Sequence, residues 1–236
     1  MALKRAASTL RGQQSSRVEF NLEDFIDTLN KQGYDVRWSK AMFCPNRDPD
    51  QEDHHKLDCD LCDFNGFVYF DPIELKALVT SYGTKQLFMP ESRYEPGTAY
   101  FTTLPEHKLS FWDRIELLTA KTRFSEVTSM ASFAGATAQL KYPALSIEKI
   151  ITNVGKEIPN DSAVVLKDGR IRFSERPVDD FFSISYFYHP TYIMIDLLHS
   201  VRDSRITIVG GDDKEVDFPS QAVGRLEFLV RDESAK

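Results

Sequence analysis

The sequence predicts a mainly β protein, an antiparallel barrel or sandwich, with one N-terminal helix and a flexible basic N-terminal arm. Many short β-type segments are separated by turn residues, as in all-antiparallel folds. Residues 181–188 alternate with the period of a half-buried strand, placing Phe182, Ile184, Tyr186 and Tyr188 on one face. Clear helical spacing occurs over residues 21–32, so helix is the minor component.

The predicted arm covers residues 1–20. Its segment Met1–Val18 contains basic residues and no acid. Such a segment can contact an acidic neighbour or nucleic acid without distorting a fold. A disordered terminus and a mitochondrial transit peptide have similar compositions and remain alternatives. The basic residues are Lys4, Arg5, Arg11 and Arg17.

Residues 21–236 are expected to form a single β-rich domain, since no repeat or linker is apparent. Hydrophobic residues make up 42% of the chain, which suffices for a core. The net charge of −7 argues against a surface that binds nucleic acid throughout. No window reaches the roughly 18 apolar residues of a membrane span, and no secretory signal opens the chain. We therefore expect cytosolic synthesis and no membrane partner.

The first elements follow from local patterns. Asn21 with an acidic first turn, apolar residues at helical spacing and Gly33 predict a helix over residues 21–32. Loose alternation over Tyr34–Phe43 predicts the first strand. Gly66–Phe70 predicts a short strand closed by Asp71-Pro72, while residues 73–81 fit either a β segment or a helical turn.

Later segments are mostly predicted strands. Asp168-Gly169 suits the tight turn of a hairpin between residues 163–166 and 170–173. His189-Pro190 is expected to end the strand over residues 181–188. We expect Phe182, Ile184 and Tyr186 in the core, and leave Tyr188 and Tyr192 open between core and interface. Further strands are predicted within residues 97–104, 109–121, 192–195 and 206–209, and at the C-terminus, where Leu226, Phe228 and Val230 alternate with Glu227 and Arg231.

The cysteines cluster in a Cys/His loop at residues 44–66. Cys59 and Cys62 have the two-residue spacing that lets two thiolates bind one metal ion, and Cys44 with His54 or His55 would complete a Cys₃His set. Thiolates and imidazole favour zinc, and a closed four-ligand site is structural. Three reduced thiols without a metal, a redox pair and a calcium-binding acidic loop are the alternatives.

No catalytic motif marks the chain as an enzyme. It has no phosphate-binding glycine loop, no G-x-S-x-G elbow, no H-E-x-x-H helix and no dinucleotide fingerprint. Two groups of polar residues near apolar segments could form an acid/base pair: His199 with Arg202 and Asp203, and Asp113 with Arg114. Internal salt bridges are the more ordinary role of such residues.

Several short motifs, taken in order, resemble those of a family of tailed-bacteriophage virion proteins from the head-to-tail junction, the neck or collar. Members carry more cysteines in the first loop, where this chain has Asn46 and two histidines. The matching motifs are Arg37-Trp38-Ser39-Lys40-Ala41, Cys44-Pro45-Asn46, Cys59-x-x-Cys62, Gly66–Tyr69, Asp113-Arg114-Ile115, Ser183–Tyr188 with His189-Pro190, and His199–Asp203.

The resemblance implies a virion protein that is assembled in the bacterial cytoplasm and has no enzymatic activity. It implies a homo-oligomeric ring that contacts portal and tail or neck proteins and surrounds the DNA channel. An acidic subunit suits this place, because like charge limits contact with the passing DNA to transient encounters. Two other functions remain open: a zinc-binding interaction or nucleic-acid-binding module, and an unmarked hydrolase using His199 and Asp203.

Overall fold

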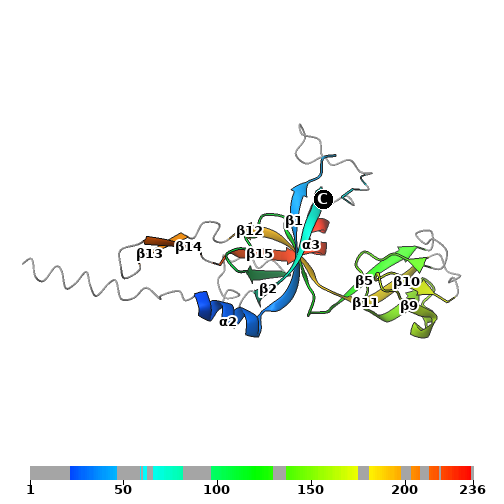
Figure 1. Ribbon diagram of the computed structural model, residues 1–236. Helices are drawn as coiled ribbons and strands as arrows, with labels where there is room; N and C mark the ends of the chain where they lie inside the picture. Colours follow the sequence, from blue (N-terminus) through cyan, green and yellow to red (C-terminus); the bar gives the residue numbers. More distant parts are fainter. Residues whose placement is uncertain are drawn as a thin grey trace, which may run out of the picture. The chain divides into compact units, whose positions relative to one another are not determined.

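The computed structural model describes residues 22–46, 59, 61–62, 66–81, 97–129, 137–174, 181–197, 203–207, 213–217 and 219–234. The chain divides into two compact units, Met1–Gln32 and Gly33–Lys236. The second unit is built from antiparallel sheets, which confirms the predicted fold class (Figure 1). The predicted arm lies outside the described residues. None of the described helices has both the length and the apolar character needed to cross a membrane.

The predicted N-terminal helix is confirmed as α2, Leu22–Gln32. Glu23 and Asp24 lie in its first turn and Lys31 in its last, where each charge complements the helix dipole. Lys31 also pairs with Asp27, one turn earlier, at 3.6 Å. Gly33 follows the last helical residue, as expected of a helix end.

Six strands of the second unit form a barrel in which every neighbouring pair is antiparallel and β4 pairs back to β1. Its interior is filled by side chains such as Val36, Phe101, Ile115 and Met194, all buried. Gly224 leaves room for two of these side chains, Met194 and Phe101, to pack against the backbone of β15. A Cβ on residue 224 would lie 2.5 Å from Met194 Cε. In order around the barrel, the strands are β1 (Tyr34–Phe43), β2 (Phe67–Ser81), β3 (Thr98–Thr102), β15 (Gln221–Leu226), β12 (Thr191–Leu197) and β4 (Arg114–Leu117).

Two smaller sheets share a second core. Phe182 of one sheet meets Phe173 of the other with ring centroids 5.5 Å apart. The predicted core residues Phe182, Ile184 and Tyr186 are buried there, and so is Tyr188. The first sheet has the order β5 (Thr122–Ser129), β11 (Phe181–Tyr188), β7 (Ser146–Thr152), β8 (Glu157–Ile158), and the second β6 (Thr137–Ala138), β10 (Ile171–Phe173), β9 (Ala163–Val165).

The predicted hairpin and strand break are also confirmed. β9 and β10 pair antiparallel around Gly169, whose φ of +78° suits glycine. β11 ends at Tyr188 and β12 begins at Thr191, on either side of His189-Pro190. Tyr192 is half-buried, and its ring lies 5.1 Å from that of Phe101. The remaining described elements are the short helix η3 (Asn160–Ser162) and the paired strands β13 (Asp203–Thr207) and β14 (Asp213–Asp217).

The expectation that Asp71-Pro72 closes a strand was wrong. β2 continues through both residues to Ser81. The pairing with β1 passes from Trp38↔Ile73 to Lys40↔Phe70, so Asp71 and Pro72 together lie opposite Ser39 in a bulge. A bulge leaves a residue out of the ladder, which suits a proline that has no N–H to donate.

The predicted C-terminal strand was wrong beyond Leu226. β15 ends there, and α3 occupies Glu227–Ser234. Phe228 packs against Phe124, with ring centroids 5.5 Å apart, and the buried Glu227 carboxylate pairs with Arg114 at 3.4 Å. These tertiary contacts favour helix over the extended alternation that the sequence suggested.

Candidate metal centre

Strands β1 and β2 continue beyond the barrel as a two-stranded ribbon, here defined as residues 40–43 paired with residues 67–70 (Figure 1). β4 pairs with β1 only over Val36–Ser39, and β3 pairs with β2 only over Leu78–Ser81. The cysteine loop therefore begins and ends at the far end of this ribbon.

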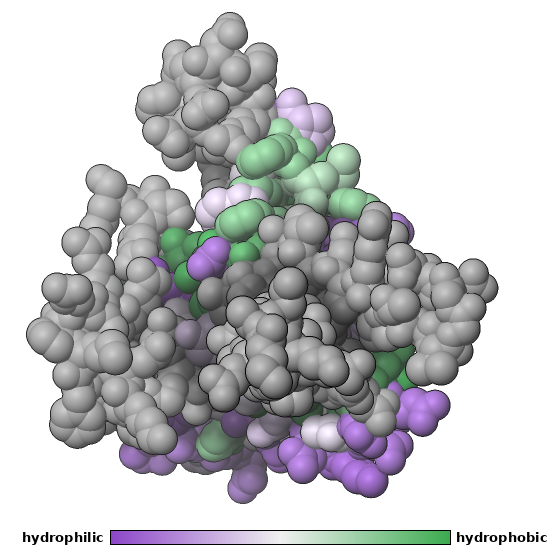
Figure 2. Space-filling view, turned by 90° about the vertical axis from the view of Figure 1, so that its left-hand side faces the viewer, coloured by the Kyte–Doolittle hydropathy of each residue, from purple (hydrophilic) through white to green (hydrophobic). Residues whose placement is uncertain are grey.

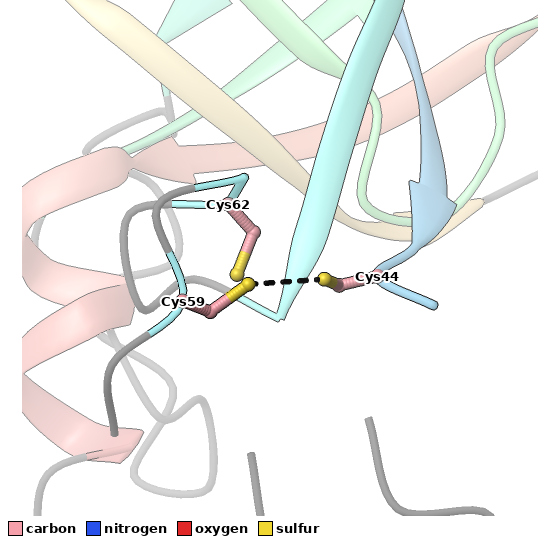
Figure 3. A group of neighbouring side chains, drawn as sticks. All are labelled: Cys44, Cys59 and Cys62. Carbon is pink, nitrogen blue, oxygen red and sulfur yellow. Dashed lines mark hydrogen bonds between the residues drawn. The ribbon is translucent and has the colours of Figure 1, made fainter. Parts of the chain in front are cut away.

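The backbone closes the ribbon where the loop starts. Cys44 follows the last residue of β1, and its N–H donates to the carbonyl of Gly66 at 2.9 Å. Gly66 has a φ of +72°, a conformation that glycine adopts without strain. This contact holds the Cys44 thiol beside the other two (Figure 3).

The three thiols face one another, as Figure 3 shows. Cys44, Cys59 and Cys62 are all buried, and their sulfur atoms lie within 4.8 Å of one another. The Cys44 and Cys59 sulfurs are 3.6 Å apart, and no disulfide joins the three residues. Two thiolates on one tetrahedral zinc, at about 2.3 Å each, lie about 3.8 Å apart. The cluster therefore has the spacing needed to bind one metal ion.

Cys59 accepts several N–H groups, and these favour its thiolate. The Asn46 side-chain Nδ2 lies 3.2 Å from Cys59 Sγ, and the backbone N–H groups of Leu61 and Cys62 also donate to Cys59. These bonds, led by that of Asn46, lower the pKa of Cys59 to about 6. Because the thiolate is the metal-binding form, Cys59 is prepared for a metal near neutral pH.

Burial acts in the opposite direction on Cys62. Desolvation raises the pKa of its thiol, and the neighbouring sulfurs of Cys59 and Cys44 raise it further, against a backbone hydrogen bond from Gly66. A cation between the sulfurs would remove this penalty, because it stabilises the thiolates that burial disfavours. The lowered pKa of Cys59 therefore favours metal binding, whereas the raised pKa of Cys62 opposes it in the absence of a cation.

The structure brings together three of the five predicted metal ligands. His54 and His55 lie outside the described residues. Asn46 is a site residue that we noted as a departure from the family but did not predict as a hydrogen-bond donor. The signal in the sequence is its position two residues after Cys44.

The polar residues considered for catalysis occupy other roles where they are described. Asp113 is buried and accepts hydrogen bonds from the Trp38 indole at 2.8 Å, the Ala41 N–H at 3.0 Å and the Ser110 N–H at 2.9 Å. Arg114 pairs with Glu227 and not with Asp113. Asp113 therefore ties the barrel to the ribbon. His199 and Arg202 lie outside the described residues, as does the side chain of Asp203.

A pocket of about 270 Å³ lies on the outer side of β1 and β4. Arg37 and Arg114 line it, but Arg37 pairs with Glu74 and Glu116 at 3.1 Å each. Since Glu227 pairs with Arg114, carboxylates offset both guanidinium charges. The pocket therefore lacks the excess positive charge that would attract an anion.

Apolar side chains are exposed beside the cysteine cluster. Phe43, Leu61 and Met42 are 58%, 55% and 54% exposed. Phe67 stacks on Trp112 at 4.8 Å and lies 5.2 Å from Phe43, between ring centroids. Met42 points to the opposite face of the ribbon from Phe43, because successive side chains of a strand alternate. We call these five residues, which lie on both faces of the ribbon's end and beside it, the apolar surface. Figure 2 shows hydrophobic residues next to one another in the upper part of the view. They lie at the same height as the end of β1 in Figure 1.

The sequence matches no protein-family model and no curated protein. In chemical terms, the described residues offer three neighbouring thiols and an amide donor to one of them. Immediately next to them lies an exposed apolar surface.

Proposed function

We propose that this chain is a structural protein of a tailed-bacteriophage virion, forming a ring of identical subunits that joins the capsid portal to the tail. The observation that carries the proposal is the apolar surface, in which Met42 and Phe43 expose more than half of their area on a projecting ribbon. Large apolar side chains that are exposed close together mark sites of protein contact, and here Phe43, Phe67 and Trp112 contact one another. The family resemblance supplies the place of that contact, at the neck or collar.

A ring requires a heterologous contact, in which one surface meets a different surface of the next subunit. Aromatic residues and methionine are enriched in the centres of such interfaces, because they bury much area. The apolar surface has this composition, and its residues Met42, Phe43 and Phe67 lie on the ribbon, outside the barrel core. Portal and tail or neck proteins are the neighbours proposed for the two faces of the ring.

We further propose that the cluster binds a structural zinc ion through Cys44, Cys59 and Cys62, with His54 or His55 as fourth ligand. Bound there, zinc would hold the thiolates in a closed tetrahedral site. The ligands would join the end of β1 to the loop that presents Leu61. The metal's role is thus to fix the end of the ribbon, and it performs no chemistry.

The test is self-association of the full chain, measured by size-exclusion chromatography with light scattering, alone and with a portal protein. We expect a homo-oligomer or a portal complex. The double variant Met42→Ser with Phe43→Ser should shift the protein towards monomer. Val127→Ser, which removes an apolar side chain 72% exposed on β5, is the matched control and should leave the assembly unchanged.

A wild-type chain that stays monomeric and binds no portal would contradict the ring. The second candidate, a zinc-binding interaction or nucleic-acid-binding module, is favoured by the thiol cluster. Titration with labelled oligonucleotides at two salt concentrations separates the two, since binding to phosphates weakens steeply with salt.

A further inference from the structure

The contact between Asn46 and Cys59 differs from the other hydrogen bonds to Cys59, because its donor is a side chain and a single substitution can remove it. The Asn46 Nδ2 lies 3.2 Å from the Cys59 sulfur, whereas the donors from Leu61 and Cys62 belong to the backbone. A substitution at position 46 removes one N–H and leaves the backbone donors in place. Asn46 also lies in the turn directly after Cys44, and the side chains of Cys44 and Asn46 both contact the Cys59 thiol.

The charge of the proposed centre explains why such a donor matters. Three thiolates around one Zn²⁺ carry a net charge of −1, and these sulfurs are buried. Hydrogen bonds to an ionised acceptor are stronger than those between neutral groups. An N–H directed at one sulfur stabilises this negative charge and fixes the position of that ligand.

We propose that Asn46 is a positioning residue that controls metal retention in this centre, by donating a hydrogen bond from its side-chain amide to the Cys59 thiolate. The inference rests on the zinc site of the proposed function. Loss of a residue that supports a metal ligand in this way lowers metal affinity about 10–100-fold. The same drop is expected for Asn46→Leu, which keeps the approximate size and removes the donor.

The experiment compares four full-length proteins: wild type, Asn46→Leu, Asn46→Asp and Asn153→Leu. Asn153, exposed in the turn between β7 and β8, is the matched control, because its only described contact is made by its backbone N–H. Zinc affinity is measured by competition with a chromophoric chelator at one fixed pH. Cobalt(II) then replaces zinc, and the sulfur-to-cobalt charge-transfer absorption reports the number of bound thiolates.

Asn46→Leu should bind zinc about 10–100-fold more weakly with unchanged charge-transfer intensity, because all three thiolates remain ligands. Asn46→Asp should bind more weakly still, since a carboxylate beside the thiolate adds repulsion. Asn153→Leu should match the wild type.

Equal zinc affinity of Asn46→Leu and wild type would overturn the inference while leaving the zinc proposal intact. A changed ligand-field spectrum in Asn46→Leu would also overturn it, because the amide oxygen would then be a ligand. Absence of zinc binding by the wild type would reject the metal centre itself, and the role of Asn46 with it.

Discussion

The barrel and the ribbon use the same two strands, β1 and β2, in opposite ways. Inside the barrel, Val36 of β1 and Ala77 of β2 are fully buried, whereas Met42 and Phe43 on the ribbon expose more than half of their surface. Burial of apolar area stabilises the barrel directly. Among the described residues, the ribbon depends on strand pairing, a few polar contacts and the thiol cluster, and an isolated two-stranded ribbon is marginal in water. The buried core and the exposed apolar side chains are therefore located in adjacent parts of one hairpin.

The largest expected effect tests the barrel. Phe101→Ala removes a buried ring that packs between the barrel strands, and such truncations cost about 3–5 kcal/mol. Urea unfolding should show this loss in the free energy of unfolding. Phe43→Ala, with the same chemical change on the exposed ribbon, should alter the free energy by less than about 1 kcal/mol. Equal effects at the two positions would remove the distinction between the regions.

The second effect tests the link between the regions. Asp113→Ala leaves the Trp38 indole, the Ala41 N–H and the Ser110 N–H without their acceptor. A buried unsatisfied donor costs about 1–3 kcal/mol, so we expect a total loss of about 3 kcal/mol in thermal or urea unfolding. Glu74→Ala, which removes a carboxylate from an exposed pair with Arg37, is the control and should cost less than about 1 kcal/mol. An unchanged free energy of unfolding in Asp113→Ala would show that water replaces the carboxylate as acceptor.

The smallest effect on global stability, and the most local, is expected from metal removal. A chelator should increase hydrogen exchange of residues 40–46 and 66–70, because the proposed zinc no longer joins Cys44 to Cys59 and Cys62. Exchange in the barrel strands β12 and β15 should stay nearly constant. Uniform acceleration across the chain would mean that the metal supports the whole fold, while no change would mean that the ribbon holds without it.

The sequence predicted those elements whose pattern is local. The helix α2, the strand β1 and the alternation of β11 each follow from residues within one segment, and all three are confirmed. The bulge at Asp71-Pro72 was not predictable in this way, because it exists only through pairing with β1. The C-terminal helix was missed because Leu226 and Val230, four residues apart, fit either period, and contacts with Phe124 and Arg114 decide between them.

The candidate centre was predictable in composition and not in geometry. The spacing of Cys59 and Cys62 indicated that both thiolates could bind one metal ion, and the structure places Cys44 with them. The bond from Asn46 to Cys59 depends on how the ribbon returns at Gly66, which no local pattern encodes. The ring, its portal and tail neighbours and its contact with DNA stay predictions.

The hydrogen bond from Cys44 to Gly66 joins the two ends of the intervening segment at two atoms only 2.9 Å apart. The length of a segment with such close ends has little influence on what it connects, since each doubling of a flexible loop costs only about 0.6 kcal/mol. A peptide tag placed between Asn46 and His54 should therefore leave the strand register and the spacing of the proposed ligands from His54 to Cys62 intact. That position offers a handle for labelling the subunit in the proposed assembly by electron microscopy.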